Sequence, residues 1–155
     1  MTALDIAKDL VAIPSVTGSE ADIAKYLEHL LLDLGCSVSL HQAAENRFNL
    51  YARYGGDQGA RPGILFHGHL DTVPPHGMDA PFVPRVEGGQ LYGRGSVDQK
   101  GGIAATVAAV EGIIASGRKL SKPVGIVFVI DEESEHRGSM ALKAMGIDAE
   151  FGVVT

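Results

Sequence analysis

The sequence predicts a three-layer αβα fold with a mostly parallel central sheet. Residues 63–67 and 124–130 are apolar without alternation, which is typical of strands covered on both faces in a parallel sheet. Residues 102–115, between these two segments, are apolar around nearly the whole circumference of a helix, so we expect a buried helix there. Strands that alternate with helices in this way indicate a layered α/β protein.

The remaining elements follow in chain order. A helix is expected over residues 2–12, where apolar side chains share one face. Ser19 is expected to cap a second helix, with Asp22 at the third position after it, and Gly35 is expected to end that helix. Alternating apolar and polar residues over 46–54 predict a half-exposed strand.

Turn residues over 55–63 predict a loop, and a short helix is expected over residues 139–145, ending at Gly146. Residues 151–154 are expected to begin another strand. Cys36 is expected to be a small core residue.

The composition is that of a globular chain. It has 155 residues, 45% hydrophobic and 21% charged, which suits one domain with a real core. The net charge of −6 gives no basic surface for nucleic acid or an anionic membrane, so neither is expected as a partner. A single cysteine and the absence of a signal-peptide pattern favour a reducing, cytoplasmic location.

Polar residues follow both apolar strands directly. His69 and Asp71 come after the first strand, and residues 131–133 (Asp-Glu-Glu) come after the second. Asp98 lies in the glycine-rich stretch 93–102, just before the buried helix. Because sites in open α/β sheets form outside the carboxyl ends of the strands, we expect these groups to meet at one edge.

Carboxylates gathered in this way repel one another unless a cation lies among them. Imidazole and carboxylate oxygen are zinc-type ligands. Asp71, two residues after His69, is suited to accept the second N–H of a metal-bound imidazole. The side chains of Glu132 and Glu133 diverge, so one can bind metal while the other acts as a general base on water.

Each residue taken singly also has an ordinary structural explanation. His69 suits a packed or solvated histidine, Asp98 suits a helix cap, and residues 131–135 suit a solvated acidic loop. His67 suits strand packing better than metal binding. Four further histidines lack ligand spacing and are assigned to the surface: His29, His41, His76 and His136.

Three other classes of site fit the residues less well. The glycine-rich stretch 93–102 has Asp98 where a dinucleotide-binding loop needs its third glycine, and a carboxylate would oppose a pyrophosphate. No Gly-x-Ser-x-Gly elbow surrounds Ser96. A His-x-His pair at a strand end is found in barrel amidohydrolases, but such a barrel needs about 250 residues.

Three motifs resemble the di-zinc metallopeptidase and deacylase family of acetylornithine deacetylase, succinyl-diaminopimelate desuccinylase and carboxypeptidase G. They are residues 69–74 (HLDTVP), residues 93–102 (GRGSVDQKGG), and residues 131–133 with the Gly-Ser pair at 138–139, in the family's order. The resemblance covers essentially the whole chain. It implies that residues 1–155 form the N-terminal segment of a catalytic domain.

The resemblance also implies roles. His69 would bind one zinc, with Asp71 as its orienting partner, and Asp98 would bridge two zincs. Glu133 would bind the second zinc, and Glu132 would be the general base. Zinc is the expected metal, two ions per complete site, with cobalt or manganese as alternatives. The expected reaction is hydrolysis of an amide bond in an N-acyl amino acid or a small peptide.

The family's peptide bond after the bridging aspartate is typically cis, so a cis Asp98–Gln99 bond is expected. Two departures are local: Gln99 replaces the commoner Met or Asn, and residues 134–137 replace a glycine-rich stretch. The family's further carboxylate ligand, its last histidine ligand and its lid and dimerisation domain are not found within residues 1–155. A truncated hydrolase is therefore one expectation. The alternative is a non-catalytic metal-binding or interaction module that self-associates or pairs with a missing C-terminal half.

Overall fold

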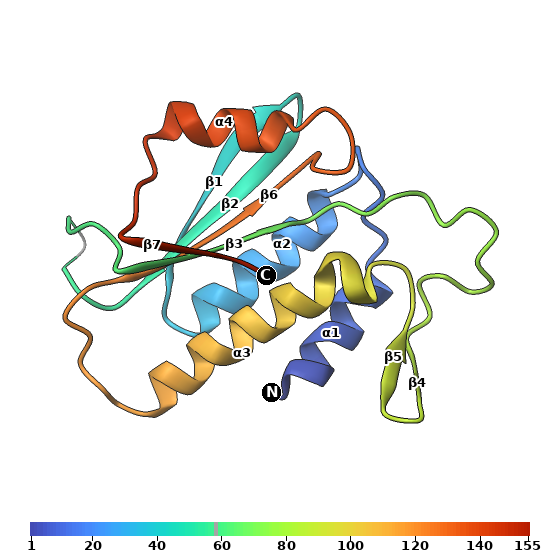
Figure 1. Ribbon diagram of the computed structural model, residues 1–155, viewed down its shortest axis with the longest axis horizontal. Coiled ribbons are helices and arrows are strands. Elements are labelled where there is room, and N and C mark those ends of the chain that lie inside the picture. The colour runs from blue at the N-terminus through green and yellow to red at the C-terminus, as the bar shows by residue number, and fades with distance from the viewer. Residues whose placement is uncertain (58) are drawn as a thin grey trace.

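The computed structural model describes residues 1–57 and 59–155 and has three layers (Figure 1). A five-stranded sheet in the order β1-β2-β6-β3-β7 lies between helices α1, α2 and α3 on one face and α4 on the other. The αβα architecture expected from the sequence is therefore confirmed. The loop expected over residues 55–63 includes residue 58, which lies outside the described residues.

The sheet combines a parallel half with an antiparallel pair. β3 (Ile64–His69) pairs in parallel with β6 (Val124–Val129) and with β7 (Phe151–Val154). β1 (Ser37–Ala44) and β2 (Arg47–Tyr54) form an antiparallel pair, and β2 joins it to β6, also antiparallel. The two apolar segments of the sequence are thus neighbouring parallel strands, and their carboxyl ends lie at the same edge.

The helices agree with the sequence except in their ends. They are α1 (Ala3–Ala12), α2 (Ala21–Asp33), α3 (Gly101–Ala115) and α4 (Arg137–Met145). A kinked segment, η1 (Ser96–Lys100), in which Asp98 and Gln99 have non-helical φ and ψ, leads into α3. The two short strands β4 (Arg85–Glu87) and β5 (Gln90–Tyr92) form a hairpin that projects from the main body (Figure 1). This hairpin is not expected from the sequence.

The first two helices begin differently. Thr2 and Asp5 form a capping box, in which each side chain accepts a hydrogen bond from the other residue's backbone N–H. The expected Ser19 cap of α2 is wrong: Glu20 holds the N-cap position, and its side chain makes no cap bond. Gly35, with φ of +85°, ends α2 as expected, since the left-handed region suits glycine.

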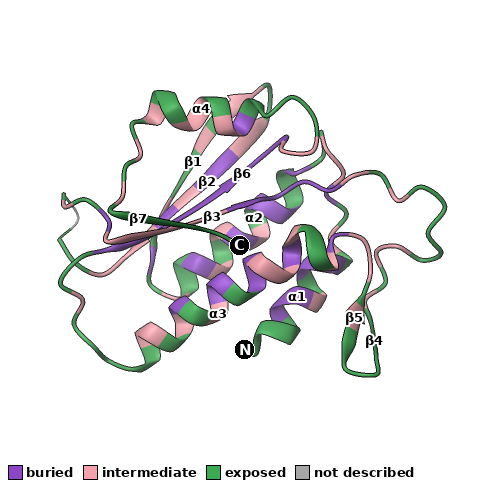
Figure 2. Ribbon diagram, viewed as in Figure 1, coloured by how far each residue is buried: buried purple, intermediate pink, exposed green. Residues whose placement is uncertain are grey.

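The core lies between the sheet and helices α1, α2 and α3 (Figure 2). Every residue of β6 is buried, and Cys36 is a core residue as expected. Helix α3 is covered on one side only, since Ala105 and Ala109 are exposed, so the expectation of a helix buried all round is wrong. No helix in the described part of the chain is long and apolar enough to cross a membrane.

Candidate metal centre

Three elements bring His69, Asp98 and Glu133 together. His69 is the last residue of β3, Asp98 lies in η1, and Glu133 lies in the loop after β6. One ligand atom from each of the three side chains lies within 4.8 Å of the other two. The parallel register pairs His69 with Val129 at the ends of neighbouring strands and so brings His69 near the loop of Glu133, while η1 supplies Asp98. The residues expected to bind metal therefore converge.

The ring of His69 is almost completely buried and is fixed at both nitrogens. Nδ1 lies 2.9 Å from the backbone carbonyl oxygen of Asp71, and Nε2 lies 2.8 Å from Asp98 Oδ1. A carbonyl oxygen only accepts, so Nδ1 carries a proton and Nε2 faces the carboxylates. Burial lowers the pKa of His69, but the hydrogen bonds with Asp71 and Asp98 outweigh it and raise the pKa to about 9.

The carboxylate of Asp71 holds the backbone of the glutamate pair. Asp71 is fully buried, and its Oδ1 accepts from the N–H of Glu132 at 3.0 Å. Its Oδ2 accepts from the N–H of Glu133 at 3.1 Å and from the Thr17 hydroxyl at 2.8 Å. His69 Nδ1 is farther away, 3.5 Å from Oδ1. Asp71 thus orients His69 mainly through its backbone carbonyl and uses its carboxylate to place the glutamates.

The cluster carries excess negative charge. Burial and the charge of Asp98 both raise the pKa of Glu133. The side chain of Glu132 is 41% exposed, and its Oε2 lies 3.9 Å from His69 Nε2. Convergent carboxylates next to a single imidazole are stabilised by a divalent cation. The donor set therefore fits a metal ion held by His69, Asp98 and Glu133.

The peptide bond Asp98–Gln99 is cis, as expected from the resemblance. Gln99, whose presence looks minor in the sequence, contacts the site directly: its Oε1 accepts from the backbone N–H of His69 at 2.6 Å. A Cβ on Gly68 would lie 2.6 Å from that same oxygen, so glycine at this position allows the contact. The position of Gln99 next to Asp98 in the sequence does not indicate that its side chain bonds the backbone of His69.

Lys100 anchors the turn that carries Asp98. It is 1% exposed, and its Nζ donates to the carbonyl of Ile13, just after α1, at 2.7 Å. Burial lowers the pKa of Lys100 to about 8. Sequence reasoning did not select this residue, although it lies inside the glycine-rich motif.

The other candidates lie outside the cluster. His67 shares a side of β3 with His69, but it is not among the described residues whose ligand atoms converge. Burial lowers the pKa of His67, as expected for a packed histidine. Asp131 turns away from the cluster to pair with Arg47, another residue that the sequence did not indicate.

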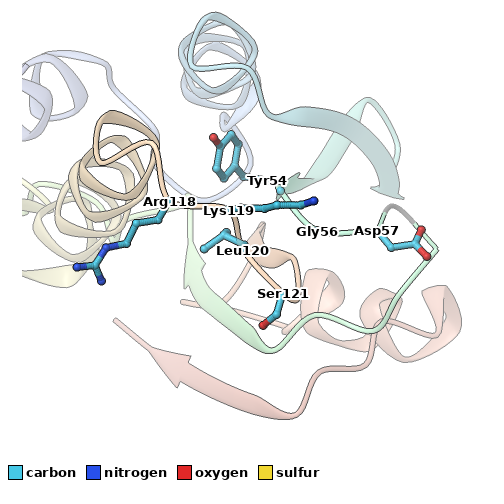
Figure 3. A pocket seen from close by; sticks show the side chains of 8 residues that line it. Tyr54, Gly56, Asp57, Arg118, Lys119, Leu120 and Ser121 are labelled. Carbon is cyan, nitrogen blue, oxygen red and sulfur yellow. The ribbon is translucent and has the colours of Figure 1, made fainter.

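A cavity among the described residues lies away from the metal-ligand cluster. A cavity of about 530 Å³ lies at the opposite end of the sheet, where β2 ends and β6 begins. Its lining includes Tyr54, Asp57, Lys119 and Ser121 (Figure 3). None of these belongs to the metal-ligand cluster of the described residues.

Fold and site together define an αβα domain with a candidate metal centre at the carboxyl ends of its parallel strands. The chain belongs to Peptidase family M20/M25/M40, whose family model matches residues 65–155. The resemblance drawn from the three motifs is therefore confirmed.

Known proteins resemble this chain both in sequence and in structure. Succinyl-diaminopimelate desuccinylase from Afipia carboxidovorans is 43% identical over 140 residues, 84% of this chain and 36% of the relative. A tripeptidase from Staphylococcus aureus has a TM-score of 0.80 at 26% identity, over 98% of this chain and 42% of that one. An aminopeptidase from Bacillus cereus gives 0.82 at 25% identity, with the same coverage. The chain thus spans about a third of the length of the curated relatives it matches.

Proposed function

We propose that this chain is the N-terminal part of the catalytic domain of a metal-dependent hydrolase that cleaves an amide bond in N-acyl amino acids or small peptides. One observation carries the proposal: His69, Asp98 and Glu133 converge within 4.8 Å, beside the open carboxylate of Glu132. The desuccinylases and peptidases among the relatives support the same class of substrate.

His69, Asp98 and Glu133 would hold zinc, with cobalt or manganese as alternatives and two ions in a complete site. When bound, the metal polarises the amide carbonyl and lowers the pKa of water. His69 is ready for this role because the carbonyl of Asp71 keeps the proton on Nδ1.

Glu132 is the proposed general base. It takes a proton from the attacking water as the water oxygen bonds to the amide carbon. As the C–N bond breaks, the same carboxylic acid gives that proton to the leaving amine. The backbone N–H groups of Glu132 and Glu133 donate to the Asp71 carboxylate, which fixes the position of the backbone that carries the Glu132 side chain. Its half-open side chain lets it reach both the water and the amine.

The ligands and the lid that the resemblance implies would come from sequence beyond residues 1–155 or from a separate chain. We propose a cytoplasmic enzyme, because the single cysteine is buried and free.

A second candidate function, a non-catalytic module that self-associates, is favoured by β7. This edge strand is exposed along its length, with Phe151 71% and Val154 77% exposed, and such edges tend to pair.

Glu132→Gln tests the proposal. The chain is loaded with zinc or cobalt and assayed on N-succinyl and N-acetyl amino acids and on dipeptides, alone and with a C-terminal family segment. We expect Glu132→Gln to lose turnover and to keep its metal. Glu135→Gln is the matched control, since Glu135 is an exposed neighbour that pairs with Arg137.

Turnover that survives Glu132→Gln would refute the assigned base. Sedimentation on the same samples separates the two candidate functions. The non-catalytic module would be favoured by an oligomer that binds metal weakly and substoichiometrically and shows no turnover, either alone or with the C-terminal segment.

A further inference from the structure

A buried ion-pair network lies beside the cluster. Arg47 on β2 donates from Nε to Glu20 Oε2 at 2.8 Å and from Nη2 to Asp131 Oδ1 at 2.8 Å. The side chains of Glu20 and Asp131 are 1% and 2% exposed, and that of Arg47 is 13% exposed. One guanidinium thus joins the start of α2 to Asp131, the second residue after β6.

Such a network has one favourable geometry. Two buried carboxylates repel each other. Removing Arg47 would leave Glu20 without its cation and would leave Asp131 with only the Arg137 guanidinium, 3.9 Å away. The planar guanidinium meets Glu20 with two parallel bonds, which fixes its direction as well as its charge. The Oδ1 side of Asp131 is therefore held from β2 and the start of α2, which carry no metal ligand, while its Oδ2 accepts from the N–H of Arg137 at 3.4 Å.

Asp131 begins the loop that bears the proposed base and ligand. Its φ is +65°, and its carbonyl accepts from the N–H of His136 at 2.8 Å. We call residues 131–136 the acidic loop. Glu132 and Glu133 follow Asp131 directly, so a change in the direction of Asp131 moves both carboxylates.

Asn49 holds the two ends of the same loop. It lies two residues from Arg47, on the same side of β2, and it is fully buried. Its Oδ1 accepts from the N–H of Ile130 at 3.1 Å, and its Nδ2 donates to the carbonyl of Gly138 at 2.8 Å. With Asn49 holding the loop ends, Arg47 decides how the first loop residue points.

We propose that Arg47 is a positioning residue for the metal centre: by holding Asp131, it directs the acidic loop so that Glu133 meets His69 and Asp98. The inference rests on the metal site of the proposed function. Asp71 holds the glutamate backbone from one side, and Arg47 holds it from the other through Asp131.

Arg47→Met tests the inference, with Arg53→Met as the matched control on the same strand, away from the cluster. Zinc affinity is measured by competition with a chromophoric chelator, and cobalt geometry by visible absorption. Hydrogen exchange follows the acidic loop without metal. We expect Arg47→Met to lower zinc affinity about 10–100-fold, as loss of a partner that orients a ligand does. We also expect an altered cobalt spectrum and faster exchange in the loop, with neither change in Arg53→Met.

A folded Arg47→Met chain with unchanged affinity, spectrum and exchange would overturn the inference. If Arg47→Met does not fold, Arg47→Lys decides, because lysine keeps the charge but cannot bond both carboxylates in the same plane. Parental affinity and exchange in Arg47→Lys would overturn it equally. A parent chain that binds zinc no better than His69→Ala would instead refute the metal site. The exchange measurement would still show whether Arg47 orders the loop.

Discussion

The two ends of the sheet differ in what their loops hold. At the carboxyl end of β3 and β6, His69 and Asp71 are buried and hydrogen-bonded, and carboxylates converge on one point. At the opposite end, a cavity of about 530 Å³ is lined by Tyr54, Lys119 and other residues without ligand convergence (Figure 3). Converging charge, rather than hollow volume, marks the candidate site in this molecule.

Glycines at the two ends also serve different purposes. Gly56, near the cavity, has φ of +63°, and a Cβ there would lie 2.5 Å from the backbone nitrogen of Pro123. That glycine is required by chain packing. Gly68, at the other end, makes room for Gln99, which holds the backbone of His69. Similar sequence features thus serve packing at one end and the site at the other.

The largest expected difference between the two ends is in metal binding. We expect His69→Ala to lower zinc affinity by more than about 100-fold, because loss of a ligand exceeds the 10–100-fold cost of losing a ligand's partner. Lys119→Ala, in the cavity, should leave the affinity unchanged. Chelator competition measures both. Equal loss in the two variants would remove the distinction between the ends.

The pH dependence of stability should come from the His69 end. In the metal-free chain the pKa of His69 is about 9, above the value of about 6.5 expected when unfolded. The folded state holds this proton more tightly, so the stabilisation is complete below about pH 6.5 and is lost as pH rises through about 9. Its size is about 3 kcal/mol.

Urea unfolding of the metal-free chain from pH 6 to 9 measures this stabilisation as the difference in the free energy of unfolding between the parent and His69→Ala. The difference is needed because the pKa of Lys100 is lowered to about 8, which makes stability rise with pH above that value. The Lys119→Ala profile should follow the parent. A constant difference between parent and His69→Ala across this range would contradict the assignment.

Asp71→Asn should have a smaller effect on stability. An amide has one acceptor oxygen, so it cannot replace the carboxylate that accepts from Glu132, Glu133 and Thr17. We expect a loss of about 1–3 kcal/mol in the free energy of unfolding. Asp57→Asn at the cavity end is the control and should stay within about 0.5 kcal/mol of the parent, as an exposed substitution does. Urea unfolding compares them, and equal losses would contradict the prediction.

The smallest effect is expected for Thr17→Val. It removes the bond from the Thr17 hydroxyl to Asp71 Oδ2 at 2.8 Å and a longer one to the Thr72 carbonyl at 3.4 Å, and it keeps the shape of the side chain. The expected loss is about 1 kcal/mol in the free energy of unfolding. Ser121→Ala, at the cavity end, should cost less. An equal loss in the free energy of unfolding for Ser121→Ala would show that the hydrogen bond to Asp71 does not stabilise the fold more than an exposed hydroxyl does.

The sequence by itself determined the layers, most of the strands and helices, and the meeting of His69, Asp98 and the glutamate pair at one edge of the sheet, while the choice of Glu133 as the ligand came from the resemblance. These features depend on local periodicity and on short motifs at strand ends, and parallel pairing brings such ends together. The resemblance added the cis bond after Asp98, which the structure contains.

Only the tertiary structure decided which residues support that cluster. Serine is a residue type that commonly caps helices, but the N-cap of α2 is Glu20 rather than Ser19, and the Glu20 carboxylate accepts a hydrogen bond from Arg47. Arg47 lies 27 residues from Glu20 and 84 from Asp131 in sequence, and no local pattern encodes contacts over such separations. A buried ion pair forms only where the fold brings the two charges together and excludes water from both, and that environment exists only once the layers have packed.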